Sequence, residues 1–131
     1  MSRKPHQPAS RQAILAVYAV VVGPRTWRSL KLAVDTGATY TMLPPDVLLD
    51  IGYDPAKTSR RLELSTANGL VMVPLVRVQA LKCLGLAVKT LDVVAHHLPP
   101  ESPVEGLLGL NVLAHFQPFQ DFFLALKRFS A

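Results

Sequence analysis

The most constraining feature of the sequence is a single carboxylate between two apolar runs. Residues 31–34 (KLAV) lead directly into Asp35, and Thr36-Gly37-Ala38-Thr39 carries the chain into a second apolar run at 40–43. A carboxylate left unpaired in an apolar setting is energetically costly. We therefore expect Asp35 to be a functional residue.

The pentapeptide Asp35-Thr36-Gly37-Ala38-Thr39 admits three interpretations. It fits the Asp-x-Gly-x-Thr phosphate loop of sugar-kinase and actin-like ATPases, although those proteins close two large domains around the nucleotide. It also fits a plain turn, because Asp, Thr and Gly all favour turns for local hydrogen-bonding reasons. The third interpretation makes Asp35 one half of a catalytic pair of carboxylates.

The composition favours a small, mainly β protein. A length of 131 residues suits one domain, and we interpret residues 1–12 as a mobile N-terminal tail and 13–131 as that domain. Eleven prolines and seven glycines favour strands and turns over a helical bundle. Half of the residues are hydrophobic, so either the core is large or a partner covers apolar surface.

Charge and cysteine content narrow the function classes. The net charge of +5 comes from scattered basic residues without interleaved aromatic residues, which argues against nucleic-acid binding. Cys83 is the single cysteine, so no intrachain disulfide forms, and we expect a cytoplasmic protein. The apolar run 13–22 is too short to span a membrane, and we interpret it as the first strand instead of a signal peptide.

Apolar runs separated by turn residues predict a succession of short strands. A short helix is expected over 44–52, since proline suits its first turn, Asp46 favours the N-terminal dipole and Gly52 suits the position after its end. A second short helix is expected over 110–116. The predicted strands are residues 14–22, 28–34, 40–43, 61–67, 70–78, 76–81, 86–94, 106–109, 117–122 and 123–129.

Asn68-Gly69 separates two strand-like runs and is the strongest hairpin signal in the chain. It predicts a type I′ turn, because both central residues of that turn need positive φ. Pro74 in the second arm cannot donate to a ladder, which indicates an edge or a bulge. We therefore expect a hairpin that projects from the sheet.

Three motifs in order resemble the retropepsin family of aspartic proteases. Leu32-Ala33-Val34-Asp35-Thr36-Gly37-Ala38-Thr39 resembles the active-site motif of that family. Gly106-Leu107-Leu108-Gly109-Leu110-Asn111-Val112-Leu113 resembles its second signature, and the Asn68-Gly69 hairpin lies between them, where the family has its flap. The resemblance covers residues 13–126.

This resemblance implies a single-domain, closed β fold with a flap hairpin and one or two short helices. Family members of this size are homodimers in which each chain gives one Asp at the twofold axis. It implies that Asp35 is catalytic, with Thr36 and Gly37 supporting it, and that no cofactor is needed. The chain ends contribute to the dimer sheet in the family, which makes candidate interface residues of Phe119, Phe122, Phe123 and Leu126.

An extended polypeptide is the substrate that the resemblance implies, and the activity is that of an aspartic endopeptidase. The alternative is a catalytically silent dimerisation or peptide-binding module on the same fold. Leu43, Val71 and Leu108 are candidates to line its pockets, although a position in the core is favoured for each. The expected substrate-binding residues are Ala38, Thr39, Asn68, Gly69, Leu70 and Leu108.

The chain departs from viral members of the family at two positions. Those members carry an acid and an arginine that pair, where this chain has Thr39 and Leu110. Both charges are absent together, so neither is left unpaired, as in the cellular and bacterial branch. No metal site is expected. The adjacent His96 and His97 would point to opposite faces if they lay in a strand, and we interpret them as a solvated pair in a loop.

Overall fold

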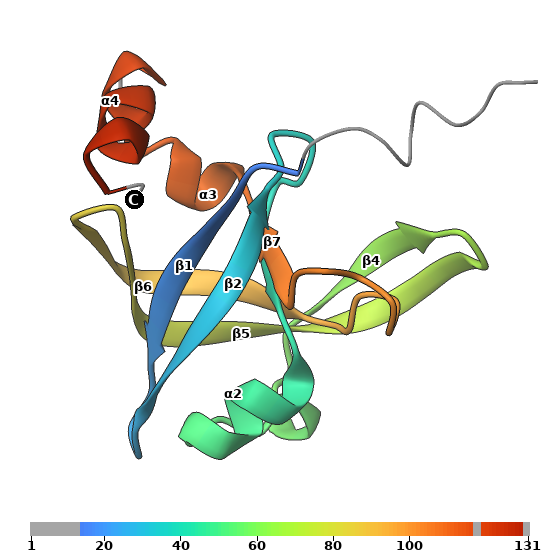
Figure 1. The fold of residues 1–131 in the computed structure, drawn as a ribbon. Helices are drawn as coiled ribbons and strands as arrows, with labels where there is room; N and C mark the ends of the chain where they lie inside the picture. The colour runs from blue at the N-terminus through green and yellow to red at the C-terminus, as the bar shows by residue number, and fades with distance from the viewer. Residues whose placement is uncertain (1–13, 117–118, 130–131) are drawn as a thin grey trace, which may run out of the picture.

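The computed structural model describes residues 14–116 and 119–129, so the tail predicted at 1–12 lies outside the described residues (Figure 1). Its strands follow the predicted order. They are β1 (Ala16–Val22), β2 (Trp27–Val34), β3 (Thr41–Leu43), β4 (Arg61–Thr66), β5 (Gly69–Cys83), β6 (Leu86–Ala95) and β7 (Gly106–Leu108).

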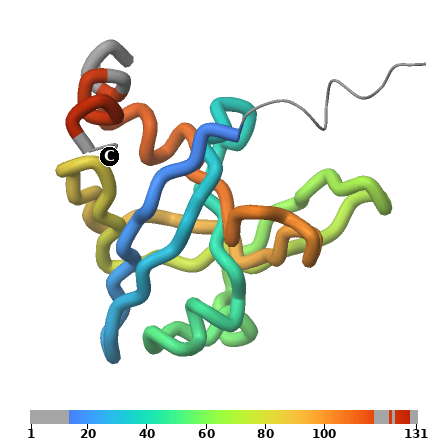
Figure 2. Tube along the Cα trace, viewed as in Figure 1, coloured from blue at the N-terminus to red at the C-terminus, as the bar shows by residue number. Residues whose placement is uncertain are grey.

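Six of these strands close into a ring. The order is β1-β2-β7-β3-β6-β5-β4, and β1 also pairs with β5 through Val20 to Val22. Because β1 meets β5, strand β4 is left outside the ring and pairs with β5 alone. The outer half of β5 and all of β4 form a two-stranded hairpin arm, residues 61–74, that projects from the ring (Figure 2).

The core lies inside the ring and under helix α2 (Pro45–Ile51). Alternating residues of β1 point inward, and Val17, Ala19 and Val21 are buried while Tyr18 is exposed. Alternation of this kind is what a half-buried strand requires. Helix α2 has the predicted punctuation, since Gly52 caps it with φ +113 and its amide donates to the carbonyl of Leu49.

The C-terminal segment is a helix, and the prediction of two closing strands there is wrong. Helix α4 runs over Phe119–Phe129 and follows the short helix α3 (Leu110–Leu113). Phe122, Ala125 and Leu126 have the i, i+3, i+4 spacing of one helical face, and all three pack against the core. Lys127 and Arg128 in the last turn favour the negative end of the helix dipole.

Because this segment is a helix, its residues do not form the strands that the predicted intersubunit sheet requires. Phe122 is 3% exposed, and its ring lies 5.3 Å from that of Phe116 in an edge-to-face contact. Leu126 is partly buried against the same core cluster. These two side chains pack within their own chain, so they are not strand residues of an intersubunit sheet. The side chains of Phe119 and Phe123 lie outside the described ones.

The hairpin turn at Asn68 also differs from the prediction. Thr66 pairs with Gly69, so the loop residues are Ala67 and Asn68. Positive φ falls on Gly69, at +108, and not on Asn68. The turn is therefore not type I′, because glycine takes the left-handed backbone one position later. Consecutive positive φ angles occur instead at Leu84 and Gly85, between β5 and β6.

Candidate active site

Strand β2 delivers Asp35 to one end of the ring. Val34 pairs with Leu108 of β7 in a parallel ladder, and the Asp35 amide donates to the Leu108 carbonyl at 3.0 Å. The amide of Val34 donates to the carbonyl of Leu15 at 2.8 Å. Asp35 thus leaves the sheet with its backbone fixed on both sides.

A tight loop orients the Asp35 carboxylate. Its Oδ1 accepts a hydrogen bond from the Gly37 amide at 2.9 Å, and its carbonyl accepts from the Ala38 amide at 3.2 Å. A Cβ on Gly37 would lie 3.2 Å from Oδ1. Glycine at this position therefore lets the backbone approach the carboxylate without crowding it.

Residues of the second signature, 106–113, form backbone hydrogen bonds with the same loop. Leu110 donates its amide to the carbonyl of Ala38 at 2.8 Å, and Asn111 donates to that of Thr39 at 3.2 Å. A Cβ on Gly109 would come within 2.6 Å of the Tyr40 backbone. The close contact of the two segments therefore requires glycine at 109.

A buried threonine and an asparagine complete this support, and neither was predicted from the sequence. Thr41 is fully buried. Its Oγ1 accepts from the Gly109 amide at 3.1 Å and donates to Asn111 Oδ1 at 3.0 Å, while its amide donates to the same oxygen at 2.9 Å. Polar residues in otherwise apolar runs, TML and LNVL, were the available signal.

The Asp35 loop opens into a groove of about 1110 Å³ between the ring and the hairpin arm. The ring side is lined by Met42, Val94 and Leu107 among others. The arm contributes residues 62–68 and Val71, and among these Leu62, Leu64 and Val71 are partly buried. The groove is mainly apolar, and Asp35 places a carboxylate at its loop end.

The predicted site residues divide into two sets. Asp35, Gly37, Ala38, Thr39 and Asn68 all line this groove.

The remaining predicted site residues are not among those that line it. Thr36 is exposed at the loop, and Gly69 and Leu70 are exposed on the arm. Leu108 is fully buried in the core, because the strand alternation turns it inward and presents Leu107 to the groove. Leu43 is also fully buried, whereas Val71 lines the groove.

The histidine pair lies in the loop that follows β6, as the sequence predicts. His96 and His97 both line the groove, and His97 Nε2 lies 3.7 Å from the carboxylate of Asp46. Among the described residues, no three His, Cys, Asp or Glu side chains form a cluster able to hold a metal ion. Cys83 is buried, and burial raises the pKa of its thiol to about 11, so the thiol is protonated at neutral pH.

Comparison with known proteins decides the family. A family model described as "gag-polyprotein putative aspartyl protease" matches residues 27–115. The chain belongs to this aspartyl protease family. Its fold is similar to the crystal structure of a retropepsin-like aspartic protease from Rickettsia conorii, with a TM-score of 0.63, 23% identity and 82% of each chain covered. The fold is thus retropepsin-like, as the sequence predicted. A search of curated proteins found no significant match.

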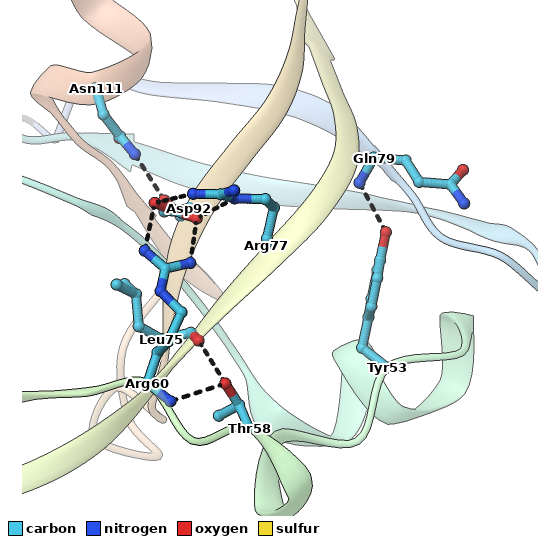
Figure 3. Close-up of polar contacts among 8 residues, drawn as sticks. All are labelled: Tyr53, Thr58, Arg60, Leu75, Arg77, Gln79, Asp92 and Asn111. Atoms are coloured by element: carbon cyan, nitrogen blue, oxygen red, sulfur yellow. Dashed lines mark hydrogen bonds and ion pairs between the residues drawn. The ribbon is translucent and has the colours of Figure 1, made fainter.

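This member of the aspartyl protease family also carries an ion-pair cluster where the hairpin arm meets the ring, as Figure 3 shows. The Asp92 carboxylate of β6 accepts from Arg60 and from Arg77, and the Asp92 carbonyl accepts from Asn111 Nδ2 at 2.6 Å. Hydrogen bonds from Arg60 and then Arg77 hold the pKa of Asp92 well below its usual range. No sequence motif indicated this cluster, because its members are far apart along the chain.

Within the described ranges, no helix of this family member is long and apolar enough to cross a bilayer.

Proposed function

We propose that the protein is an aspartic endopeptidase whose catalytic centre forms when two copies bring their Asp35 carboxylates together. One observation carries the proposal: Asp35 lines the same groove as the inner face of the hairpin arm. A carboxylate and a peptide-sized, mainly apolar space therefore coincide. Membership of the aspartyl protease family supports the same chemistry.

The second carboxylate comes from a second copy, because the chain contains one Asp-Thr-Gly motif. Apolar surface beside the loop supports self-association at this point. Ile14 and Leu15 are 54% and 45% exposed, and the Leu15 carbonyl accepts from Val34, the residue before Asp35. A twofold axis through this surface would place the two Asp35 loops against each other, in a self-complementary interface.

The chemistry follows from two carboxylates that share one proton, since neighbouring like charges do not both ionise readily. The ionised Asp35 takes a proton from a bound water, whose oxygen attacks the scissile carbonyl carbon. The protonated Asp35 donates its proton to the carbonyl oxygen. Proton transfer to the amide nitrogen then breaks the C–N bond and releases an acid and an amine.

The neighbours of Asp35 have supporting roles in this proposal. Gly37 fixes one carboxylate oxygen through its amide, at 2.9 Å. Thr36, exposed at the tip of the loop, places its hydroxyl across the dyad toward the partner copy. The apparent pKa values of activity then belong to the pair and not to either chain alone.

Substrate binds as an extended strand in the groove, with alternate side chains in apolar pockets. Ala38 and Thr39 border the peptide backbone on the loop side. The hairpin arm acts as the flap that closes over the peptide and excludes water. Leu62, Leu64 and Val71 on its inner face supply apolar contacts.

The decisive test compares the wild-type protein with Asp35→Asn, which keeps the shape of the side chain and removes its acid–base function. Dimerisation is measured by analytical ultracentrifugation, and a peptide library is assayed from acidic to neutral pH. The wild type is expected to cut library peptides between apolar residues, and Asp35→Asn to cut none. Cleavage that survives the substitution would contradict the proposal. Binding of peptides without cleavage by the wild type would favour a silent binding module.

A further inference from the structure

The base of the hairpin arm is closed by a small set of polar contacts. The Leu75 amide donates to the carbonyl of Arg60 at 2.8 Å. Thr58 Oγ1 donates to the Leu75 carbonyl at 3.1 Å and accepts from the Arg60 amide at 3.2 Å. Arg60 therefore stands at the point where the chain enters the arm, with its backbone fixed on β5.

The Arg60 side chain reaches past β5 to the next strand of the ring. Its Nη1 and Nη2 donate to the two carboxylate oxygens of Asp92 in β6, at 2.9 and 2.8 Å. Strand β4 pairs with β5 and not with β6. The fork is therefore a side-chain link between the arm and β6, a strand with which β4 shares no backbone hydrogen bonds. A bidentate guanidinium–carboxylate pair fixes direction as well as distance.

Arg77 contacts the same carboxylate but has a different structural position. It lies on β5 directly opposite Asp92 in the β5–β6 ladder, and its Nε donates at 3.0 Å. Loss of Arg77 would leave those two strands joined by their backbone hydrogen bonds. Arg60 precedes β4, which has no ladder to β6, so backbone pairing does not duplicate its link to that strand.

Asp92 also connects to the support of the Asp35 loop. Its carbonyl accepts from Asn111 Nδ2 at 2.6 Å, and Asn111 Oδ1 accepts from Thr41. The backbone N–H of Asn111 also donates to the carbonyl of Thr39. One residue of β6 therefore holds the arm through its side chain and the asparagine under the Asp35 loop through its backbone (Figure 3).

We propose that Arg60 is a positioning residue: its fork to Asp92 fixes the hairpin arm over the groove, at a set position relative to Asp35. This inference rests on the proposed protease function for its kinetic consequence. Arg60 is not among the residues that line the groove, so it acts through the arm and not by contact with substrate. Loss of the fork widens the range of arm positions, and peptide is then bound more weakly.

The test compares Arg60→Gln with Arg77→Gln in the whole chain, by hydrogen–deuterium exchange and by peptide kinetics. In Arg60→Gln, amides of residues 61–74 are expected to exchange about threefold faster, with ring amides unchanged, which is the scale of one partly exposed ion pair at the arm base. The KM for peptide is expected to rise by a similar factor, with kcat changed less. Arg77→Gln is expected to move both quantities much less.

Two further variants sharpen the comparison. Arg60→Lys keeps the charge without the fork and is expected to fall between Arg60→Gln and wild type. Asp50→Asn breaks the Arg28–Asp50 pair, whose side chains are 42% and 61% exposed and belong to β2 and α2 and not to the arm. This variant is expected to leave arm exchange and KM unchanged.

Equal effects of Arg60→Gln and Arg77→Gln on arm exchange would overturn the inference, and so would uniformly faster exchange throughout the ring. The exchange measurement needs no catalysis, so it separates this inference from the protease proposal. Faster arm exchange in Arg60→Gln, in a protein that cuts no peptide, would support the positioning role and contradict the protease function.

Discussion

Asn111 Oδ1 accepts two hydrogen bonds from Thr41, one from its amide at 2.9 Å and one from its hydroxyl at 3.0 Å. The hydroxyl in turn accepts from the Gly109 amide at 3.1 Å. These bonds join β3, which leaves the Asp35 loop, to the segment that follows β7. The loop is thus held between two parts of the chain about seventy residues apart, and its geometry depends on tertiary contacts.

Thr41→Val is expected to lower the free energy of unfolding by about 1–3 kcal/mol. Valine keeps the shape but leaves the buried Gly109 amide and Asn111 oxygen each without one partner. Urea denaturation measures the loss. Thr39→Val is the control, because Thr39 is exposed, and it is expected to change stability by less than about 0.5 kcal/mol. Equal losses for the two variants would contradict the role of the buried hydroxyl.

Gly109→Ala is expected to destabilise the protein by about 1–3 kcal/mol through overpacking. The residue has φ −97, which alanine tolerates, so the cost is the clash of a Cβ with Tyr40 at 2.6 Å. Peptide cleavage should fall as well, because the clash displaces the loop that carries Asp35. Denaturation and kinetics on the same preparation measure both.

Gly69→Ala is the matched control for that substitution. Gly69 has φ +108, and no atom lies within 4 Å of the position that an alanine Cβ would take, so its cost is backbone strain alone, about 1–2 kcal/mol. The Asp35 loop should keep its geometry. If Gly109→Ala proves as stable as the wild type, the close contact between the two signature segments is not needed.

Leu107 and Leu108 are adjacent but are expected to respond differently to truncation. Leu108→Ala removes a fully buried core side chain and should cost about 2–5 kcal/mol of stability. Leu107→Ala enlarges the groove, so it should shift the preferred peptide side chain toward larger residues at a smaller stability cost. Thermal unfolding and a peptide library separate the two effects. A large change of specificity in folded Leu108→Ala, with none in Leu107→Ala, would contradict the assignment.

The Asp92 ion pairs predict a defined pH dependence of stability. Their hydrogen bonds lower the pKa of Asp92 in the folded state, so the stabilisation is complete above the unfolded pKa, about 3.9, and is lost as pH falls toward the folded value. The stability difference between wild type and Asp92→Asn should be constant above about pH 5 and shrink below about pH 4. Denaturation across this range measures it. A difference that grows on acidification would have the wrong sign for this ion pair.

Local signals in the sequence predict most of the strands and helix α2, whereas the closed arrangement of the strands is implied by the resemblance to retropepsins. Asp46 and Gly52 mark the helix α2 correctly because caps and dipoles act within one turn. The apolar runs on both sides single out Asp35, whereas site roles for Gly37 and Ala38 are implied by the resemblance to retropepsins. Leu108 was assigned to the groove in place of Leu107, because the run Gly-Leu-Leu-Gly does not reveal which leucine faces inward.

Longer-range features were not predictable in the same way. The sequence predicts two closing strands over residues 117–122 and 123–129, but the spacing of Phe122, Ala125 and Leu126 matches a helical face that the core covers. The Arg60–Asp92 fork joins residues 32 positions apart. No local pattern in the sequence specifies a contact of that kind, which depends on how β5 and β6 are paired.

The most direct test of the central claim is the activity of a single-chain tandem, two copies joined by a flexible Gly/Ser linker, in which only one copy carries Asp35→Asn. If each active site uses the Asp35 of both copies, this tandem should retain less than about 1% of the kcat/KM of the unsubstituted tandem, since no dyad remains to share a proton. A tandem that keeps about half of the activity would show that each copy has its own complete site, and would contradict the account.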